Sequence, residues 1–445
     1  MDLSLYAANR GALMERLPGG LIVLGAAPEV LRNGDVHYKF RQSSHFLYLT
    51  GVEEPGCALL LDPRRKKEIL FIPKLTQEHA VWLGHIPSRE EAAARFGFKD
   101  VRYRSTLPKA VAAAKKGYKE IFAGKEIAPE IRKAAGTAGL KPTALEEALS
   151  ELRAVKRAAE IAFLREANRV TAQGHLAAMR AARPGMREYQ VQAELEREFL
   201  RGGLAHMGYS SIVAAGRNSA VLHYHQNSAP ILDGDLLLID AGAECQGYTA
   251  DVTRTFPVSG KFSPRQREIY ELVLAAQKEC IGRCVPGITS GELHRHSCLV
   301  LGQGLLDLGL AKGGAEELVE TEAIRVFYPH GLTHMLGLDV HDVQGGKKRH
   351  VPPAKGAKKL RFNARLESGF VITMEPGLYF VPALLDDPKV RAKHKGRINF
   401  EKAGAYRDFG GIRIEDDICV QSSGPPLNLT TAPKEIADVE AACAR

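Results

Sequence analysis

The chain has 445 residues, 45% of them hydrophobic, and a formal net charge of +9 at pH 7. This length predicts two or three domains, and no apolar run reaches the roughly 20 residues that would span a bilayer. The N-terminal residues lack a basic segment followed by an apolar one, and the seven cysteines are scattered, so we expect a cytoplasmic protein with free thiols rather than a membrane-bound or disulfide-rich secreted one.

The excess of basic residues raises the question of nucleic-acid binding. They gather at 64–67 and in a second stretch made up of Lys347, Lys348, Arg349, Lys355, Lys358, Lys359 and Arg361. Neither stretch has interleaved aromatic side chains on which bases could stack, so we predict no nucleic-acid partner. A solvated loop is the simplest interpretation of the second stretch.

Residues 1–153 alternate strand-like and helix-like segments. Apolar runs predict strands at 19–25, 45–52, 57–62, 68–73 and 119–124. Helices are predicted at 88–97, where Ser88 is a candidate cap, and at 106–117. This part has no glycine-rich phosphate loop and no clustered ligands, so we predict an α/β domain without chemistry of its own.

The second half begins with a charged, helix-rich stretch at 146–182, where we place the domain boundary. Further helices are predicted at 185–203, ended by glycines, and at 264–284, capped near Ser263. No internal repeat is visible.

Acidic residues follow buried strands in this half. The apolar run 236–239 leads into Asp240, and the run 371–374 leads into Glu375. A carboxylate at the end of such a strand is costly unless it is paired, hydrogen-bonded or bound to metal. Asp251 comes 11 residues after Asp240 with two glycines between them, which predicts two adjacent antiparallel strands that bring both carboxylates together.

Two further segments complete the pattern. Alternation in 412–415 places Arg413 and Glu415 on one face of a strand, and His334 lies in a glycine-rich stretch that starts at His330. Taken alone, each has an ordinary explanation: a turn-forming aspartate, a surface ion pair, or a structural histidine. Together they form a set of four carboxylates and one imidazole, which is too anionic for one divalent ion and suits two cations such as Mn²⁺ that share carboxylates. Two adjacent metals generate hydroxide at neutral pH, so the set predicts a hydrolase.

Several blocks also carry a family resemblance, namely 218–225, 240–270, 328–343, 374–380 and 409–417. Over residues 154–428 the sequence resembles the pita-bread metallopeptidases, and specifically their proline-specific branch of aminopeptidase P and prolidase. The resemblance implies an α/β (α+β) protein with an N-terminal creatinase/prolidase-type domain at 1–153 and a C-terminal pita-bread catalytic domain at 154–445. It also implies a homodimer.

The resemblance implies roles for eleven residues around the metals. The metal ligands would be Asp240, Asp251, His334, Glu375 and Glu415, with Asp251 and Glu415 bridging two ions, preferably Mn²⁺, with Co²⁺ or Zn²⁺ as alternatives. A bridging water or hydroxide would attack the scissile carbonyl, Glu375 would pass on its proton, and His341 would stabilise the oxyanion. His223 and His330 match the remaining active-site histidines and, with Tyr209, are expected to bind substrate. Tyr379 and Arg413 are expected to orient the ligands.

The choice between dipeptidase and aminopeptidase P depends on fewer features. Arg361 falls where prolidases have an arginine that binds the carboxylate of a dipeptide, and the basic residues around it would draw that carboxylate in. The 39 residues between Glu375 and Glu415 also resemble prolidases in length. We therefore predict hydrolysis of Xaa-Pro dipeptides, with aminopeptidase P as the alternative. Thr333, where prolidases usually have glycine, departs from the pattern and could alter substrate fit.

Rivals outside these two activities are weaker. A non-catalytic pita-bread binding protein, or a metal-free enzyme like creatinase, uses the same fold. Their relatives lack the complete ligand set that this chain keeps, so site residues rather than fold decide the prediction.

Overall fold

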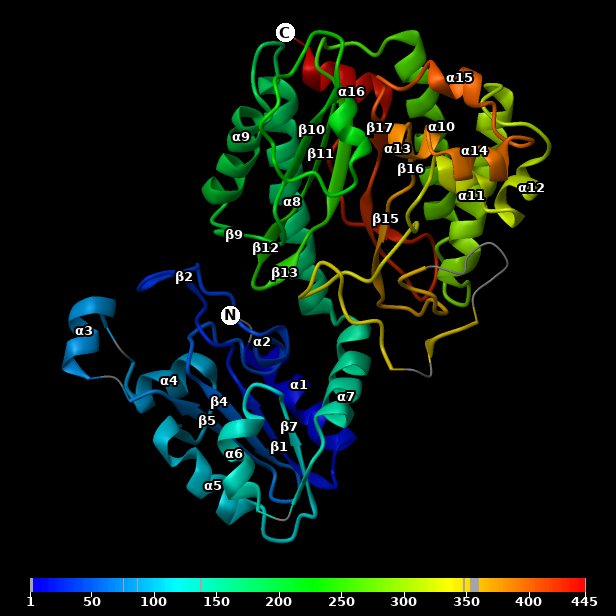
Figure 1. The fold of residues 1–445 in the computed structure, drawn as a ribbon. Helices are drawn as coiled ribbons and strands as arrows, with labels where there is room; N and C mark the ends of the chain where they lie inside the picture. The colour runs from blue at the N-terminus through cyan, green and yellow to red at the C-terminus, as the bar shows by residue number, and fades with distance from the viewer. Residues whose placement is uncertain are drawn as a thin grey trace. The chain divides into compact units, whose positions relative to one another are not determined.

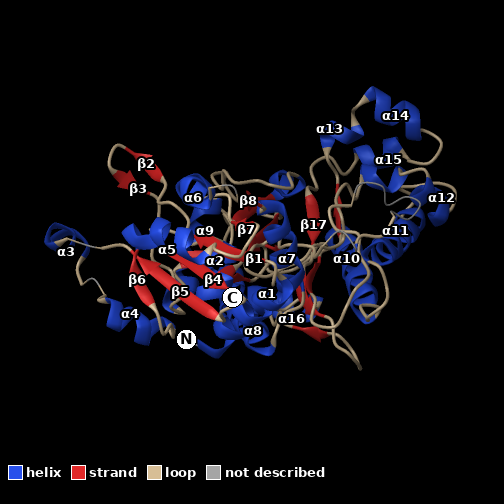
Figure 2. Ribbon diagram, turned by 90° about the horizontal axis from the view of Figure 1, so that it is seen from below, coloured by secondary structure: helices blue, strands red, loops and turns tan. Residues whose placement is uncertain are grey.

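A computed structural model describes residues 3–74, 76–85, 87–136, 138–346, 349–352 and 360–444. The chain forms two compact units, one comprising Met1–Arg153 with Gly345–Lys348, the other comprising Ala154–Gln344 with Arg349–Arg445 (Figure 1). Helices and strands occur in both, so the fold is mixed α/β (Figure 2). Among the described residues no helix is both long and apolar enough to cross a membrane. All seven cysteines are buried and unpaired.

The first unit is built on one six-stranded sheet with the order β6-β5-β4-β1-β7-β8. Its strands are β1 (Gly20–Gly25), β4 (Ala58–Asp62), β5 (Lys67–Ile72), β6 (Val101–Tyr103), β7 (Glu120–Ala123) and β8 (Gly139–Leu140). Strand β1 is buried along its whole length and pairs antiparallel with β4 and parallel with β7. A central strand needs apolar side chains on both faces, which explains its continuous hydrophobic run.

Helices and a small hairpin complete this unit. The helices are α1 (Leu3–Arg16), α2 (Ser44–Thr50), α3 (Gln77–Leu83), α4 (Arg89–Phe96), η1 (Arg104–Thr106), α5 (Leu107–Ala114), α6 (Ala128–Ala135) and α7 (Pro142–Ala154), and the hairpin consists of β2 (Leu31–Asn33) and β3 (Val36–His37). Val111 of α5 and Ile131 of α6 pack against Val23 of β1 in one buried cluster. The predicted helix at 88–97 is confirmed, with Ser88 accepting a hydrogen bond from the Glu91 amide.

One predicted strand of this unit is wrong. Most of the stretch 45–52 belongs to helix α2 (Ser44–Thr50) instead, which is capped by Gly51 with φ 65° and a hydrogen bond from the Gly51 amide to the Leu47 carbonyl. A short apolar run fits a buried helix as well as a buried strand, so periodicity could not decide between them. Gly51, directly after the last helical residue, was the signal for a helix terminus.

The second unit places short antiparallel sheets between two groups of helices (Figure 1). Its helices are α8 (Ala158–Ala181), α9 (Glu188–Arg201), η2 (Gly216–Ala220), α10 (Pro264–Gly282), α11 (Ser290–Asp307), α12 (Ala315–Glu320), η3 (Ala323–Val326), α13 (Pro382–Leu385), α14 (Pro388–His394), α15 (Phe400–Gly404) and α16 (Ile436–Cys443). Its strands are β9 (His206–Met207), β10 (Ile212–Ala215), β11 (Leu236–Ala241), β12 (Ala243–Cys245), β13 (Tyr248–Thr249), β14 (Val252–Pro257), β15 (Val371–Met374), β16 (Gly377–Tyr379), β17 (Gly411–Arg413), β18 (Asp416–Cys419) and β19 (Leu427–Asn428).

Three sheets of this unit carry the candidate site. Their orders are β10-β11-β14, β15-β18-β19 and β16-β17. The apolar faces of the first and third join one large buried cluster with α8, α9, α10 and α11, in which Leu237, Ile412 and Leu301 are fully buried. Burial of this kind fixes the strands rigidly, and their ends then hold functional side chains at defined positions.

Candidate metal centre

Asp240 and Asp251 are positioned by one pair of strands. Strands β11 and β14 are antiparallel, and Asp240 lies opposite Thr253, two residues after Asp251. The prediction of adjacent antiparallel strands is confirmed, although the connection is longer than a turn and includes the hairpin of β12 and β13. A Cβ at Gly242 would lie 1.8 Å from the Ala250 carbonyl oxygen, so this crossing requires glycine.

Glu375 and Glu415 approach from a second pair of strands. Strand β15 pairs with β18 so that Met374 lies opposite Asp416, which brings Glu375 and Glu415 to the same end of the sheet. The Glu415 amide donates to the Thr253 carbonyl at 3.1 Å and thereby joins this end to β14.

The segment that contains His334 forms two backbone hydrogen bonds with residues at the end of β15. The Thr373 amide donates to the His334 carbonyl at 3.0 Å, and the Glu375 amide donates to the Leu332 carbonyl at 3.0 Å. Residues far apart in the sequence therefore meet at one end of three sheets.

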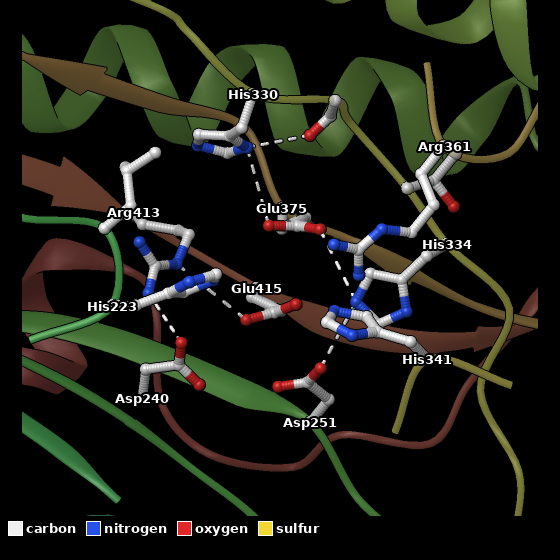
Figure 3. A pocket seen from close by; sticks show the side chains of 13 residues that line it. His223, Asp240, Asp251, His330, His334, His341, Arg361, Glu375, Arg413 and Glu415 are labelled. Carbon is white, nitrogen blue, oxygen red and sulfur yellow. Dashed lines mark hydrogen bonds and ion pairs between the residues drawn. The ribbon is translucent and has the colours of Figure 1, made fainter. Parts of the chain in front are cut away.

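Ten of the twelve residues predicted from the sequence line one cavity of about 280 Å³ (Figure 3). They are His223, Asp240, Asp251, His330, His334, His341, Arg361, Glu375, Arg413 and Glu415. The other two, Tyr209 and Tyr379, lie behind these residues and donate or accept hydrogen bonds with them. The five lysines of the predicted basic stretch, at 347, 348, 355, 358 and 359, fall outside the described residues.

The closest group of potential ligands consists of Asp251, His334 and Glu415. One ligand atom from each lies within 4.8 Å of the others. His334 Nε2 is 3.3 Å from Asp251 Oδ2 and 3.6 Å from Glu375 Oε1. Its Nδ1 lies 3.0 Å from the Met335 carbonyl, and a proton on Nδ1 would leave the Nε2 lone pair directed at the carboxylates, as a metal-binding imidazole requires.

The carboxylates of this cavity are crowded. Burial raises the pKa of Asp240, raises that of Glu375 to about 7, and raises that of Glu415 well above its ordinary value, with repulsion from neighbouring carboxylates adding to the effect. The Tyr209 hydroxyl is 2.6 Å from both Asp240 Oδ1 and Asp251 Oδ1, although it carries only one proton. Such an excess of negative charge fits divalent cations, which would satisfy several of these oxygens at once.

The electrostatic surroundings of His334 also indicate a binding site for a cation. Although burial lowers it, the hydrogen bond to Asp251 and the charge of Glu375 raise the pKa of His334 to about 9. The surrounding field therefore favours a positive charge at Nε2. A cation bound between these carboxylates would occupy the same favourable potential.

Arg413 orients two of the carboxylates. Its Nη2 donates to Asp240 Oδ2 at 2.6 Å, and its Nε donates to Thr253 Oγ1 at 3.0 Å. The Thr253 hydroxyl in turn donates to Glu415 Oε2 at 2.6 Å. One guanidinium thus fixes ligands from two different sheets.

Tyr379 extends this network to His330. Its hydroxyl accepts from Arg413 Nη1 at 2.9 Å and lies 2.8 Å from His330 Nε2. His330 Nδ1 lies 2.8 Å from the Gly331 carbonyl. Burial and the charge of Arg413 lower the pKa of His330 to about 3, so the ring is neutral at pH 7, with Nδ1–H donating to the carbonyl and Nε2 accepting from the tyrosine.

The remaining predicted residues form the rim. The ring of His341 lies 4.4 Å from that of His334, and burial together with the charges of His334 and Arg361 lowers the pKa of His341 to about 4. His223 and Arg361 are exposed within the cavity. In the part of the chain that the structure describes, the Arg361 guanidinium forms no ion pair. The Thr333 hydroxyl is buried and lacks a partner among the described residues, although Thr333 lines the cavity.

Two acids of the site were missed in the sequence. Asp417 Oδ2 accepts from the Asp251 amide at 3.0 Å and from Asn168 Nδ2 at 2.7 Å. Asp416 forms a fully buried ion pair with Arg254, which also donates to the Glu415 carbonyl at 2.7 Å. Three consecutive acids after an apolar strand were the available signal, because such a run is too costly to bury without partners.

Comparisons with known proteins agree with this geometry. The sequence profile of Metallopeptidase family M24 matches residues 162–422, and that of the Aminopeptidase P, N-terminal domain matches residues 6–122. The chain is 34% identical to a human Xaa-Pro dipeptidase, over 100% of this chain and 94% of the relative. It is 38% identical to a Xaa-Pro aminopeptidase of Haemophilus influenzae, over 95% of this chain and 93% of the relative.

Solved structures give the same result. Proline aminopeptidase P II from Yersinia pestis superposes with a TM-score of 0.86 at 34% identity, with 100% of this chain and 99% of that chain covered. The aminopeptidase PepP of Pseudomonas aeruginosa superposes with a TM-score of 0.85 at 37% identity, with 100% and 98% covered.

Proposed function

This chain belongs to metallopeptidase family M24, and from that premise we propose that it hydrolyses the peptide bond before proline in Xaa-Pro dipeptides. Residues 154–445 would form the catalytic domain. The observation that carries the dipeptidase assignment is the Arg361 guanidinium, which lines the cavity beside His341 without an ion-pair partner among the described residues. A planar guanidinium at this place is suited to grip the free carboxylate of a C-terminal proline.

The metals would be held by the five predicted ligands, Asp240, Asp251, His334, Glu375 and Glu415. Their hard oxygen atoms and single imidazole suit Mn²⁺ first, with Co²⁺ or Zn²⁺ as alternatives. Two such cations would supply Lewis acidity and would make a water molecule nucleophilic at neutral pH.

The side chains of the protein would do the rest. Glu375 Oε1 lies 3.6 Å from His334 Nε2, whereas Glu375 Oε2 faces His330 Nδ1 at 3.6 Å. We assign the uptake and return of a proton to Oε2, which is turned away from the candidate ligand. His341, neutral because of its low pKa, would donate an N–H to the carbonyl oxygen as negative charge develops there.

Aminopeptidase P activity on longer peptides is the second candidate. It is favoured by the solved structures reported above, both of which are aminopeptidases P, and by the 38% identity to a Xaa-Pro aminopeptidase. The two activities differ in where the substrate carboxylate lies. A tripeptide places its carboxylate one residue beyond proline. It would then lie out of reach of an arginine positioned for the carboxylate of a dipeptide.

The deciding experiment compares Gly-Pro with a Xaa-Pro-Xaa tripeptide on protein supplied with Mn²⁺. We expect the dipeptide to be cleaved faster, and Arg361→Ala to lose about 2–5 kcal/mol of transition-state stabilisation on the dipeptide but much less on the tripeptide. Arg365→Ala is the matched control, because Arg365 is exposed four residues away and does not line the cavity. Faster tripeptide cleavage by the unaltered protein would assign aminopeptidase P instead.

Quaternary structure and location are also proposals. We propose a cytoplasmic homodimer that takes small peptides as substrates and has no nucleic-acid or membrane partner. Light scattering on the purified protein gives the oligomeric state directly.

A further inference from the structure

Glu188 is a buried carboxylate that the proposed chemistry does not use. It is the first residue of α9 and its relative exposure is 0%. Among the described residues no arginine, lysine or histidine forms an ion pair with it. A buried charge without a counter-ion must be stabilised by hydrogen bonds, and the helix N-terminus adds a favourable dipole.

Among the described residues this carboxylate has four donors, and all of them come from one segment, residues 215–229. Oε1 accepts from the Ala215 amide at 2.8 Å and from Asn218 Nδ2 at 2.9 Å. Oε2 accepts from the Tyr224 hydroxyl at 2.8 Å and from the Ala229 amide at 2.8 Å. The two oxygens therefore hold the start, the middle and the end of the segment at once.

The same segment carries cavity residues. Leu222 and His223 line the candidate site, whereas Tyr224 is buried and donates to Glu188. Residues 222 and 223 form a turn, and Tyr224 follows it directly, so the bond from the Tyr224 hydroxyl to Glu188 fixes the backbone next to His223. Residues 221–229 belong to no helix or strand, so the segment lacks the regular backbone pairing that would otherwise fix it.

We propose that Glu188 is a positioning residue for substrate binding, which acts by fixing the 215–229 segment and thereby His223. The inference rests on the proposed peptidase function, because it assigns His223 to substrate. It predicts that loss of the carboxylate acts through His223 alone and leaves the metal ligands in place.

The test begins with Glu188→Gln, which keeps the size of the side chain. Only one terminal atom of glutamine accepts, and its amide group faces two of the four donors, so about half of the anchoring bonds are lost. We expect kcat/KM on Gly-Pro to fall about 10–100-fold. Hydrogen exchange at the amides of Ala215 and Ala229 should become faster, whereas Mn²⁺ binding, measured by metal analysis, should not change.

A double variant separates positioning from a general structural role. If Glu188 acts through His223, then Glu188→Gln combined with His223→Ala should be no slower than His223→Ala alone, within about twofold. Glu160→Gln is the matched control, because Glu160 is equally buried and accepts from the Arg157 amide and the Tyr248 hydroxyl, outside the segment. It should retain full activity and slow exchange at both amides.

Three results would overturn the inference. One is a loss of kcat/KM in the double variant equal to the product of the two single losses. The others are full activity of Glu188→Gln and full activity of His223→Ala. If Glu188→Gln does not fold, Tyr224→Phe removes one donor with little change in shape, and unchanged activity and exchange in that variant overturn it equally. An unaltered protein that cleaves no Xaa-Pro peptide would refute the proposed function, and the exchange rates would still decide whether Glu188 orders the segment.

Discussion

Two strands, one in each unit, end in nearly the same sequence. Strand β4 reads Ala-Leu-Leu-Leu-Asp and closes on Asp62, and strand β11 reads Leu-Leu-Leu-Ile-Asp before its final alanine and carries Asp240. Both aspartates are largely buried. Their environments nevertheless move the two pKa values in opposite directions.

The difference lies in what surrounds each carboxylate. Burial raises the pKa of Asp62, but hydrogen bonds from Arg65 at 2.7 Å and from the Tyr118 hydroxyl at 2.8 Å leave it below its ordinary value. Asp240 also has a cation, Arg413, yet burial and the nearby Asp251 keep its pKa raised. An acid at the end of a buried strand is therefore not diagnostic of function. The diagnostic feature is an excess of carboxylates over cations around it.

The largest expected effect on activity comes from removing one of the carboxylates that crowd the candidate metal centre. Asp251→Ala and Glu415→Ala should each abolish peptidase activity and lower the content of bound metal, because each would serve both cations. Asp62→Asn, the matched change in the first unit, should keep metal and activity. Metal analysis beside a peptidase assay measures both, and full activity of either alanine variant would refute the two-metal proposal.

Metal binding should also appear as stability. At a Mn²⁺ concentration 100 times the dissociation constant, the folded protein gains about 2.7 kcal/mol. The rise in unfolding temperature on addition of Mn²⁺ should occur in Asp62→Asn and disappear in Glu415→Ala.

A second comparison concerns two ion pairs, Asp416–Arg254 and Asp62–Arg65, which differ in the exposure of the arginine. Asp416 and its partner Arg254 are both 0% exposed, whereas Arg65, the partner of Asp62, is 46% exposed. Asp416→Asn leaves a buried guanidinium uncompensated and should lower the free energy of unfolding by about 3–5 kcal/mol. Asp62→Asn should cost no more than about 1 kcal/mol. Urea unfolding measures both, and equal losses would contradict the argument from exposure.

Substitution of His341 distinguishes a residue that acts on the substrate from one that holds metal. His341→Ala should keep metal and leave KM nearly unchanged, while kcat falls about 10²–10³-fold, because the proposed N–H bond strengthens only in the transition state. Steady-state kinetics with metal analysis checks this. Unchanged turnover would make His341 a structural residue.

The smallest effect is the pH dependence of Asp62. Its pKa is lowered in the folded protein, so its ionised form stabilises the fold above the ordinary aspartate pKa of about 3.9, and this contribution is lost as pH falls through the lower folded value. The stability difference between the unaltered protein and Asp62→Asn should be constant from pH 7 to 5 and narrow below about pH 4. A difference that widens in acid would show that Asp62 is not held by these bonds.

Sequence reasoning reached the site more completely than the fold. Asp240 and Glu375 could be found because an acid after an apolar strand is costly, and that cost is visible locally. Helix α2 was mistaken for a strand because its apolar run, residues 46–49, is too short to distinguish the two periods. Asp417 could not be assigned, because its partners, Asn168 and the Asp251 amide, are 249 and 166 residues away and only the tertiary fold brings them together.

The bonds of Asp417 also bear on when the site can form. A ribosome that adds roughly 5–20 residues per second reaches Asp417 roughly 8–33 s after it has passed Asp251, 166 residues earlier. Until then the Asp251 amide lacks its acceptor, and the carboxylates of Glu415 and Asp251 have not met. Contacts so distant along the chain also close slowly once they exist. A growing polypeptide of this kind would therefore have no hydrolytic centre during most of its own synthesis.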